Sequence, residues 1–372
     1  MVRRAILVLL LAVSSALSQT DALDSALAMI GETRATFRVN PEIMITRTGG
    51  TDKLAIFDQW FADPLKIPFY ERNLRDMLLD TKGRLHPLFN NCAAAIGIGT
   101  RRDLTGRTPR EKFAERAKKP DALQKAILAL DANASIHEPQ AVPERIQQLA
   151  AMLLFAMEDA IEWRNLALRK ISPLELPALF THLSQPLERP VKDTTKTEEN
   201  SPQASAAFCG DMELLEKVDL RLLAAGMDDL TAAMDSVCSA LTADSSEEPF
   251  SFICSTRYGE IILSGGNAQG YGDDHTYLLI LDLSGDDTYH AGGGTVDEAH
   301  PVSVIIDAAG NDTYESTDNK PCFGAGILGY GIVADLQGKD RYVTHGYMSQ
   351  GCGVGGVGLL RDKDGNDFYS AR

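Results

Sequence analysis

Pairs of carboxylates recur at a regular interval in the last quarter of this 372-residue sequence. The pattern is Asp-x-x-Gly-x-Asp-x-Tyr, and its four copies begin 25, 28 and 27 residues apart. Carboxylate oxygens are ligands that calcium prefers in proteins, so a repeated pair could hold a repeated ion. We therefore predict calcium ligands among the paired aspartates, which are Asp282, Asp287, Asp307, Asp312, Asp335, Asp340, Asp362 and Asp367.

Stacking the four copies would bring like charges together. In a parallel ladder the second aspartates would form one column with a spacing of about 4.8 Å, at which carboxylates repel one another. Three arrangements could relieve the repulsion: bound cations, backbone N–H donors from the glycine turns, or carboxylates turned outward to water. Only the first of these is a function, and the residue types leave all three open.

A tyrosine closes each copy of the pattern, two residues after the second aspartate. These are Tyr289, Tyr314, Tyr342 and Tyr369. Residues two apart lie on the same face of a strand. If the aspartates face outward, the tyrosines form an exposed aromatic stripe that could stack on sugar rings. Tyrosines stacked inside the coils are the more common arrangement, and we favour it.

The period of the pattern predicts the fold that positions these residues. Repeats of 25 to 28 residues are too long for one strand and fit one coil of a stacked solenoid. Short apolar runs lead into the first aspartates, as Leu278–Leu281 does before Asp282. We predict a parallel β-solenoid over residues 251–372. The glycines of the pattern are expected to supply turns with positive φ, and they are Gly285, Gly310, Gly338 and Gly365.

The sequence Gly-Asn-Asp at residues 310–312, and again at 365–367, resembles part of the hemolysin-type (RTX) nonapeptide. That nonapeptide is Gly-Gly-x-Gly-x-Asp-x-U-x, and the resemblance implies calcium bound between coils. The first two glycine positions of the nonapeptide hold other residues here, such as Asp307 and Ala308. A wider pattern runs from Ser-Gln-Gly-x-Gly at Ser349–Gly353 into Leu-Leu-x-Asp-x-x-Gly-Asn-Asp-x-Tyr. It is similar to Gly/Asp-rich repeats in exported bacterial proteins of unassigned function.

The residues before about position 250 have helical periodicity. We predict a helical domain over residues 19–186, a polar linker or long loop over 187–207, and a helical hairpin over 208–250. Gly226 is expected to split that hairpin, which would cap the first coil of the solenoid or attach a partner. The chain as a whole is then an α+β multidomain protein, with an N-terminal all-α domain before a C-terminal parallel β-solenoid (β-helix).

The helical half offers little catalytic chemistry. Glu158, Asp159 and Glu162 share one long predicted helix. Glu158 and Glu162 are one turn apart, and an acidic pair of this kind beside Arg164 usually forms a solvated face. The histidines there, such as His86, are isolated in sequence, and no nucleophile, zinc or nucleotide-binding motif accompanies them. We predict no catalytic residues.

The N-terminus and the charge bear on location and partners. Residues 1–18 combine two arginines, a short apolar run and the small residues Ala16 and Ser18 at the positions of a cleavage site. This pattern predicts a cleaved signal peptide and a secreted or periplasmic protein. The formal net charge is -16, and from Cys254 onward 17 acidic residues face seven Lys and Arg. Nucleic acid is therefore not expected as a partner, whereas cations are.

Two functions fit these patterns best. The first is a structural or binding role for a calcium-stabilised repeat protein, with an extracellular polysaccharide or a cell-surface protein as its partner. The alternative is a polysaccharide-active β-helix enzyme, a lyase or hydrolase, although catalytic residues are usually singular and these recur with the fold. The last copy ends at Tyr369, so we expect either a truncated array or an open edge that supports end-to-end self-association.

Overall fold

The computed structural model describes Asp24 and residues 27–29, 31–36, 67–99, 109–137, 142–185, 210–241, 249–316 and 320–371. The predicted signal peptide and the predicted linker at 187–207 lie outside these ranges. The chain divides into two compact units, Met1–Lys82 and Gly83–Arg372. In the first unit the structure describes α5 (Ile67–Asp80) together with a short turn region. Among the described helices, none is both long and apolar enough to cross a membrane.

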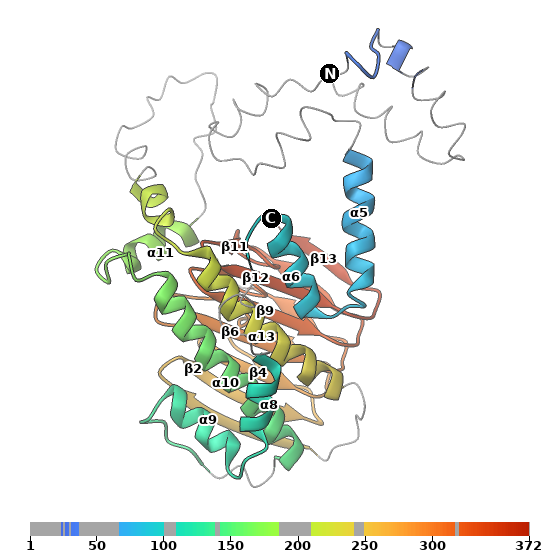
Figure 1. The fold of residues 1–372 in the computed structure, drawn as a ribbon. Coiled ribbons are helices and arrows are strands. Elements are labelled where there is room, and N and C mark those ends of the chain that lie inside the picture. Colours follow the sequence, from blue (N-terminus) through green and yellow to red (C-terminus); the bar gives the residue numbers. More distant parts are fainter. Residues whose placement is uncertain are drawn as a thin grey trace, which may run out of the picture. The chain divides into compact units, whose positions relative to one another are not determined.

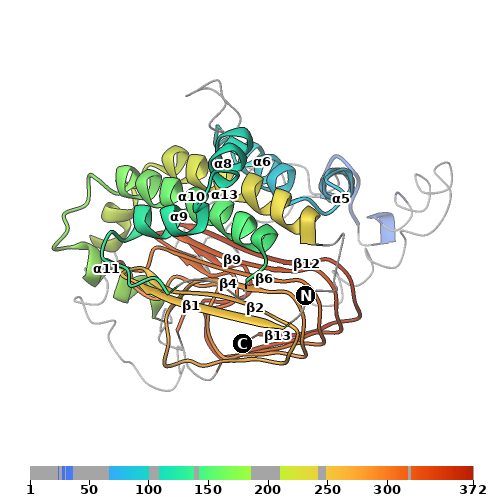
Figure 2. The same cartoon turned by 90° about the horizontal axis from the view of Figure 1, so that it is seen from below.

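The second unit confirms the predicted fold class, because helices in the N-terminal half precede a C-terminal parallel β-solenoid (Figure 1). Six described helices of this unit pack beside the solenoid. They are α6 (Leu85–Ala95), α8 (Pro109–Ala117), α9 (Ala122–Leu130), α10 (Glu144–Ala167), α11 (Leu176–Ser184) and α13 (Leu220–Leu241). Figure 2 shows this helical layer on one side of the stacked strands.

Two sheets form the walls of the solenoid. The first has the strand order β1-β2-β4-β6-β9-β12 and the second has the order β13-β10-β7-β5-β3. The strands of the first sheet are β1 (Phe250–Thr256), β2 (Gly259–Gly265), β4 (Tyr277–Asp282), β6 (Val302–Asp307), β9 (Tyr330–Asp335) and β12 (Val357–Asp362). Those of the second are β3 (Gly270–Tyr271), β5 (Thr288–Tyr289), β7 (Thr313–Glu315), β10 (Arg341–Thr344) and β13 (Phe368–Ala371).

The strand pairing follows the sequence repeat. A small third sheet pairs β8 (Gly326–Ile327) with β11 (Gly353–Val354), and only β1 and β2 pair antiparallel in the described sheets. From β2 onward, each long strand of the first sheet is followed along the chain by a short strand of the second. We call each such pair a layer, so that β2–β3 is layer 1, β4–β5 layer 2, β6–β7 layer 3, β9–β10 layer 4 and β12–β13 layer 5.

The first sheet is covered on both faces, which explains its continuous apolar strands. Along β4, Leu279 and Leu281 belong to the core shared with the helices, whereas Ile280 packs inside the solenoid against the tyrosines. The strand alternation therefore turns Asp282, two residues after Ile280, toward the solenoid interior. The helices bury the outer face, and the inner face carries the repeated aspartates.

The predicted break at Gly226 is wrong, because α13 continues through this residue. A side chain at position 226 would overlap the Tyr330 hydroxyl, which donates to the Leu223 carbonyl at 3.0 Å. The glycine thus allows β9 to approach α13 closely. In Figure 1, α10 and α13 cross the face of the first sheet, while β1 forms that sheet's edge beside layer 1.

The turn glycines also need a correction. Gly285 and Gly365 have positive φ values, of 140° and 154°, but Gly310 and Gly338 are not among the positive-φ residues. A Cβ at Gly310 would overlap the Gly285 carbonyl oxygen, and one at Gly338 would overlap that of Gly310. Close approach between layers, rather than positive φ, therefore requires glycine at Gly310 and Gly338.

Candidate metal centre

The first aspartates of the repeats lie inside the solenoid in register, as Asp282 pairs with Asp307 and Asp307 with Asp335 along the first sheet. These three side chains are fully buried. Tyrosine hydroxyls from the second sheet donate to this column of carboxylates. The bonds are Tyr289 Oη to Asp307 Oδ2 at 2.6 Å, Tyr314 Oη to Asp335 Oδ2 at 2.8 Å and Tyr369 Oη to Asp362 Oδ2 at 2.7 Å.

The tyrosines form a stacked ladder within the solenoid, as favoured from the sequence. Ring centroids of neighbouring layers lie 4.6 to 4.7 Å apart, with interplanar angles of 2° to 15°. Tyr289, Tyr314 and Tyr342 are fully buried, whereas Tyr369 in layer 5 is 48% exposed. An outward stripe for sugar stacking is therefore not what the structure shows.

The second aspartates tie each layer to the next through the backbone. The N–H of Asp287 donates to Asp312 Oδ1 at 2.6 Å, and that of Asp312 donates to Asp340 Oδ1 at 2.7 Å. The N–H of Asp340 donates to Asp367 Oδ1 at 3.0 Å. One oxygen of each carboxylate is thus used by the fold. The Oδ2 atoms of Asp287, Asp312 and Asp340 are buried without a hydrogen-bond partner, as is Oδ1 of Asp335.

Three groups of carboxylates result, each shared between two adjacent layers. We call them triads, and within each the potential ligand oxygens lie within 4.8 Å of one another. The triads are Asp287–Asp307–Asp312, Asp312–Asp335–Asp340 and Asp340–Asp362–Asp367. The first two are buried throughout, while Asp362 and Asp367 of the third are partly exposed. Seven of the eight predicted ligands are therefore brought together.

Asp282 lies outside the triads, because layer 1 holds Gln269 at the position where a second aspartate would complete a triad around it. Its Oδ2 accepts hydrogen bonds from Ser264 Oγ at 3.0 Å and from the Tyr271 hydroxyl, and its Oδ1 accepts the Ser284 N–H at 3.1 Å. Ser264 pairs with Asp282 in the first sheet, and Tyr271 pairs with Tyr289 in the second. Layer 1 is thus a further copy of the repeat with a serine in place of the first aspartate.

Sequence reasoning missed layer 1 because its aspartates are absent. By the same register, Gln269 stands in layer 1 where Asp287 stands in layer 2, and its N–H donates to Asp287 Oδ1. The signal that could have found this copy is Gly270-Tyr271, which lies 18 residues before Thr288-Tyr289. Neutral side chains therefore close one end of the carboxylate column.

No family model, curated protein or solved structure matches this chain. Its candidate site is interpreted from geometry alone.

Burial raises the pKa of the triad carboxyls, and neighbouring carboxylates add to the effect. The pKa is raised to about 7 for Asp287 and Asp312, to about 8 for Asp335 and to about 6 for Asp340. For Asp307 it is raised well above its usual range. At neutral pH such a column therefore has two ways to limit its negative charge. Some of the carboxyls bind protons and become neutral, or a bound cation keeps them ionised.

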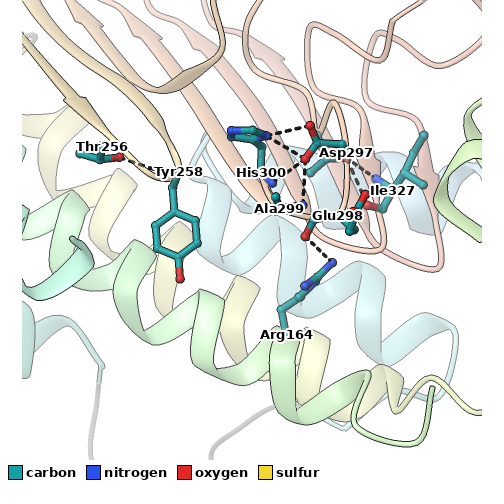
Figure 3. Close-up of polar contacts among 9 residues, drawn as sticks. Arg164, Thr256, Tyr258, Asp297, Glu298, Ala299, His300 and Ile327 are labelled. Carbon is teal, nitrogen blue, oxygen red and sulfur yellow. Dashed lines mark hydrogen bonds and ion pairs between the residues drawn. The ribbon is translucent and has the colours of Figure 1, made fainter. Parts of the chain in front are cut away.

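A second polar cluster lies where the helices meet the solenoid, and Figure 3 shows Arg164 reaching from α10 toward the loop that carries Asp297 and His300. Arg164 is buried and donates to the carbonyl oxygens of Leu328 at 2.7 Å and Glu298 at 3.1 Å. Asp297 Oδ1 accepts the His300 N–H at 2.9 Å and lies 2.7 Å from His300 Nδ1. The Arg164 bonds hold the helical layer against the solenoid, and the Asp297–His300 bonds close a turn.

The carboxylates of α10 also have structural partners. Glu158 pairs with Arg116 at 2.7 Å and Asp159 with Lys112 at 2.5 Å, so both join α10 to α8. Of the pair predicted to be solvated, Glu162 is exposed and Glu158 is partly exposed, whereas Asp159 is only 7% exposed. His86 lies 2.7 Å from Asp228 of α13 and is a satisfied residue of the helical layer.

Proposed function

We propose that this chain is a secreted or periplasmic repeat protein with a structural or binding role, whose solenoid is stabilised by calcium ions held in the three triads. One observation carries the proposal: a buried carboxylate oxygen without a hydrogen-bond partner recurs at the same place in each triad, in Asp287, Asp312 and Asp340. A buried acceptor of this kind is costly unless a partner satisfies it. Its repetition with the layers favours a repeated ligand.

Calcium fits these triads better than magnesium does. Calcium binds oxygen at about 2.3 to 2.6 Å in flexible geometry, so two ligands on opposite sides of the ion lie up to about 5 Å apart. The oxygens of each triad lie within 4.8 Å of one another, which is inside that span. Magnesium binds at about 2.0 to 2.1 Å and usually keeps several waters, whereas most side chains of the triads are buried.

An ion in a triad would link neighbouring layers. In the first triad, Asp287 belongs to layer 2, whereas Asp307 and Asp312 belong to layer 3. The ion would offset the repulsion between carboxylates that the fold stacks in register, and it would satisfy the unpartnered oxygens. The expected consequence is a solenoid that resists heat and proteases when calcium is present.

The enzyme alternative has less support. A polysaccharide-active β-helix needs carboxylates that a polymer can reach, whereas Asp282, Asp307 and Asp335 are fully buried inside the solenoid. Secretion, a polysaccharide or cell-surface partner, and end-to-end association stay predictions.

Calcium-dependent melting tests the proposal. We expect the melting temperature of the chelator-treated chain to rise by about 5 °C or more in millimolar calcium, because a ligand of the native state stabilises it by mass action. Magnesium at the same concentration should have a smaller effect. No change with calcium would contradict the proposal.

Matched variants test whether the calcium-induced rise in melting temperature arises in the triads. Asp335→Asn changes a buried triad carboxylate, whereas Asp364→Asn changes an exposed aspartate of the same repeat region. We expect the calcium-induced rise to shrink in the first and to be unchanged in the second. Terbium emission excited through tyrosine gives an independent readout, because Tyr314 donates a hydrogen bond to Asp335. Equal emission from the two variants would place the ion elsewhere.

A further inference from the structure

Two aspartates belong to more than one triad. Asp312 is common to the first and second triads, and Asp340 is common to the second and third. Asp287 and Asp367 occupy the same place in the repeat but each belongs to a single triad. The three triads are therefore a continuous series rather than three separate groups.

The shared carboxylates are held in a fixed orientation with one oxygen available. Oδ1 of Asp312 accepts the Asp287 N–H at 2.6 Å, and Oδ1 of Asp340 accepts the Asp312 N–H at 2.7 Å. Both side chains are at most 2% exposed, and both Oδ2 atoms are buried without a partner. Unpartnered buried oxygens at both shared positions point to a ligand that the acidic cluster alone would not establish.

The close spacing of the layers favours sharing of carboxylates between neighbouring ions. Stacked tyrosine rings place neighbouring layers 4.6 to 4.7 Å apart, so ions in neighbouring triads would be separated by a similar distance. Paired metal ions in enzymes lie about 3.5 to 4 Å apart and are held by ligands that offset their mutual repulsion. A carboxylate placed between two calcium ions would supply that negative charge.

We propose that the triads hold calcium as a single file of three ions, in which Asp312 and Asp340 each bind two ions. This inference rests on the proposed calcium-stabilised function. It adds that the ions share ligands and that the binding of each ion depends on its neighbours. Loss of a shared aspartate then removes two ions, whereas loss of a terminal aspartate removes one. Each ion also stabilises the carboxylate that its neighbour needs, so the ions bind interdependently.

The test counts ions in matched variants of the full chain. Calcium bound per chain after dialysis is measured by elemental analysis for Asp287→Asn, Asp312→Asn, Asp340→Asn and Asp367→Asn. Asparagine keeps an oxygen for the backbone N–H at each position, and circular dichroism checks the fold. We expect three ions in the unsubstituted chain, two in Asp287→Asn and Asp367→Asn, and one in Asp312→Asn and Asp340→Asn.

The outcomes separate the two proposals. Absence of bound calcium in the unsubstituted chain would overturn both the calcium function and the file. Calcium that binds but is lost equally from Asp312→Asn and Asp287→Asn would overturn the file and leave the function standing.

A measurement without variants covers the case in which a substituted chain fails to fold. The unsubstituted chain is loaded with terbium alone or with a mixture of terbium and neodymium. Ions in a file lie close enough for energy transfer, so the terbium lifetime should shorten in the mixture. An unchanged lifetime would overturn the file.

Discussion

The first and last layers of the solenoid share one backbone register but carry different side chains. In layer 1, Ser264 and Gln269 stand where layer 5 has Asp362 and Asp367. Layer 1 nevertheless pairs with its neighbour through both sheets, and Tyr271 stacks on Tyr289 at 4.7 Å. A layer of this solenoid therefore forms without either aspartate.

This difference teaches which residues the fold needs. Tyrosine recurs in every layer, and glycine recurs at the turn position of layers 2 to 5, where each layer closely approaches the one before it. In layer 1, Asn267 takes the glycine position, and Ser264 and Gln269 take the two aspartate positions. Buried carboxylates in the other layers carry a desolvation cost that the turn itself does not impose. Their repetition supports a role in ligand binding.

The largest effect is expected where layers touch through glycine. Gly338→Val would drive a side chain into the Gly310 carbonyl, and we expect it to destabilise the solenoid by more than about 4 kcal/mol. Gly270→Val in layer 1 is the matched control, because a Cβ there meets no atom within 4 Å. Protease resistance and soluble yield measure both variants. Equal resistance of the two would show that close approach is not what requires glycine.

A smaller change in stability is expected when the pH is varied in the absence of metal. The folded-state pKa of Asp335 is raised to about 8, and that of Asp312 to about 7, against about 3.9 in an unfolded chain. A raised pKa favours the protonated native state, so this stability is fully present below about pH 4 and is lost as the pH rises through 7 and 8. We expect the melting temperature of the metal-free chain to fall by about 5 °C or more between pH 5 and pH 8.

The variant Asp335→Asn should flatten that fall, since it removes the group that titrates. Asp362→Asn in the partly exposed layer 5 should flatten it less, and saturating calcium should oppose the fall because the metal favours ionised carboxylates. A metal-free melting temperature that rises over this range would contradict the buried, protonated column.

Removing tyrosine hydroxyls compares inner and outer layers. Tyr289→Phe deletes the donor to buried Asp307 Oδ2, so we expect a loss of about 1 to 3 kcal/mol in the free energy of unfolding. Tyr369→Phe deletes the same kind of bond at a half-exposed position, where water can replace the donor, and should cost less than about 0.5 kcal/mol. Denaturant unfolding measures both, and a larger loss in Tyr369→Phe would contradict the difference in burial.

The sequence predicted the ladder well because its signal is local and periodic. The run Leu278–Leu281 lies within β4, and the spacing of the first aspartates matches the pairing of Asp282 with Asp307. The inward position of the aspartates was not predictable from the motif alone, because burying a carboxylate depends on donors from other strands. The continuity of α13 depends on Tyr330, which lies far along the chain from Gly226 and fills the space that the glycine leaves.

The smallest expected change in stability, and the most direct test of the comparison, comes from Gln269→Asp. A triad consists of a second aspartate, then the first and second aspartates of the next layer, as in Asp287–Asp307–Asp312. Layer 2 already supplies Asp282 and Asp287. An aspartate at position 269 would therefore complete a fourth triad, shared between layers 1 and 2. Gln269 is partly exposed, which limits the cost of the added charge. We expect calcium bound per chain to increase by one, with Gln269→Glu as a control whose longer side chain changes the geometry. An unchanged count in Gln269→Asp would mean that Asp282, whose Oδ2 accepts hydrogen bonds from Ser264 and Tyr271, does not bind an ion.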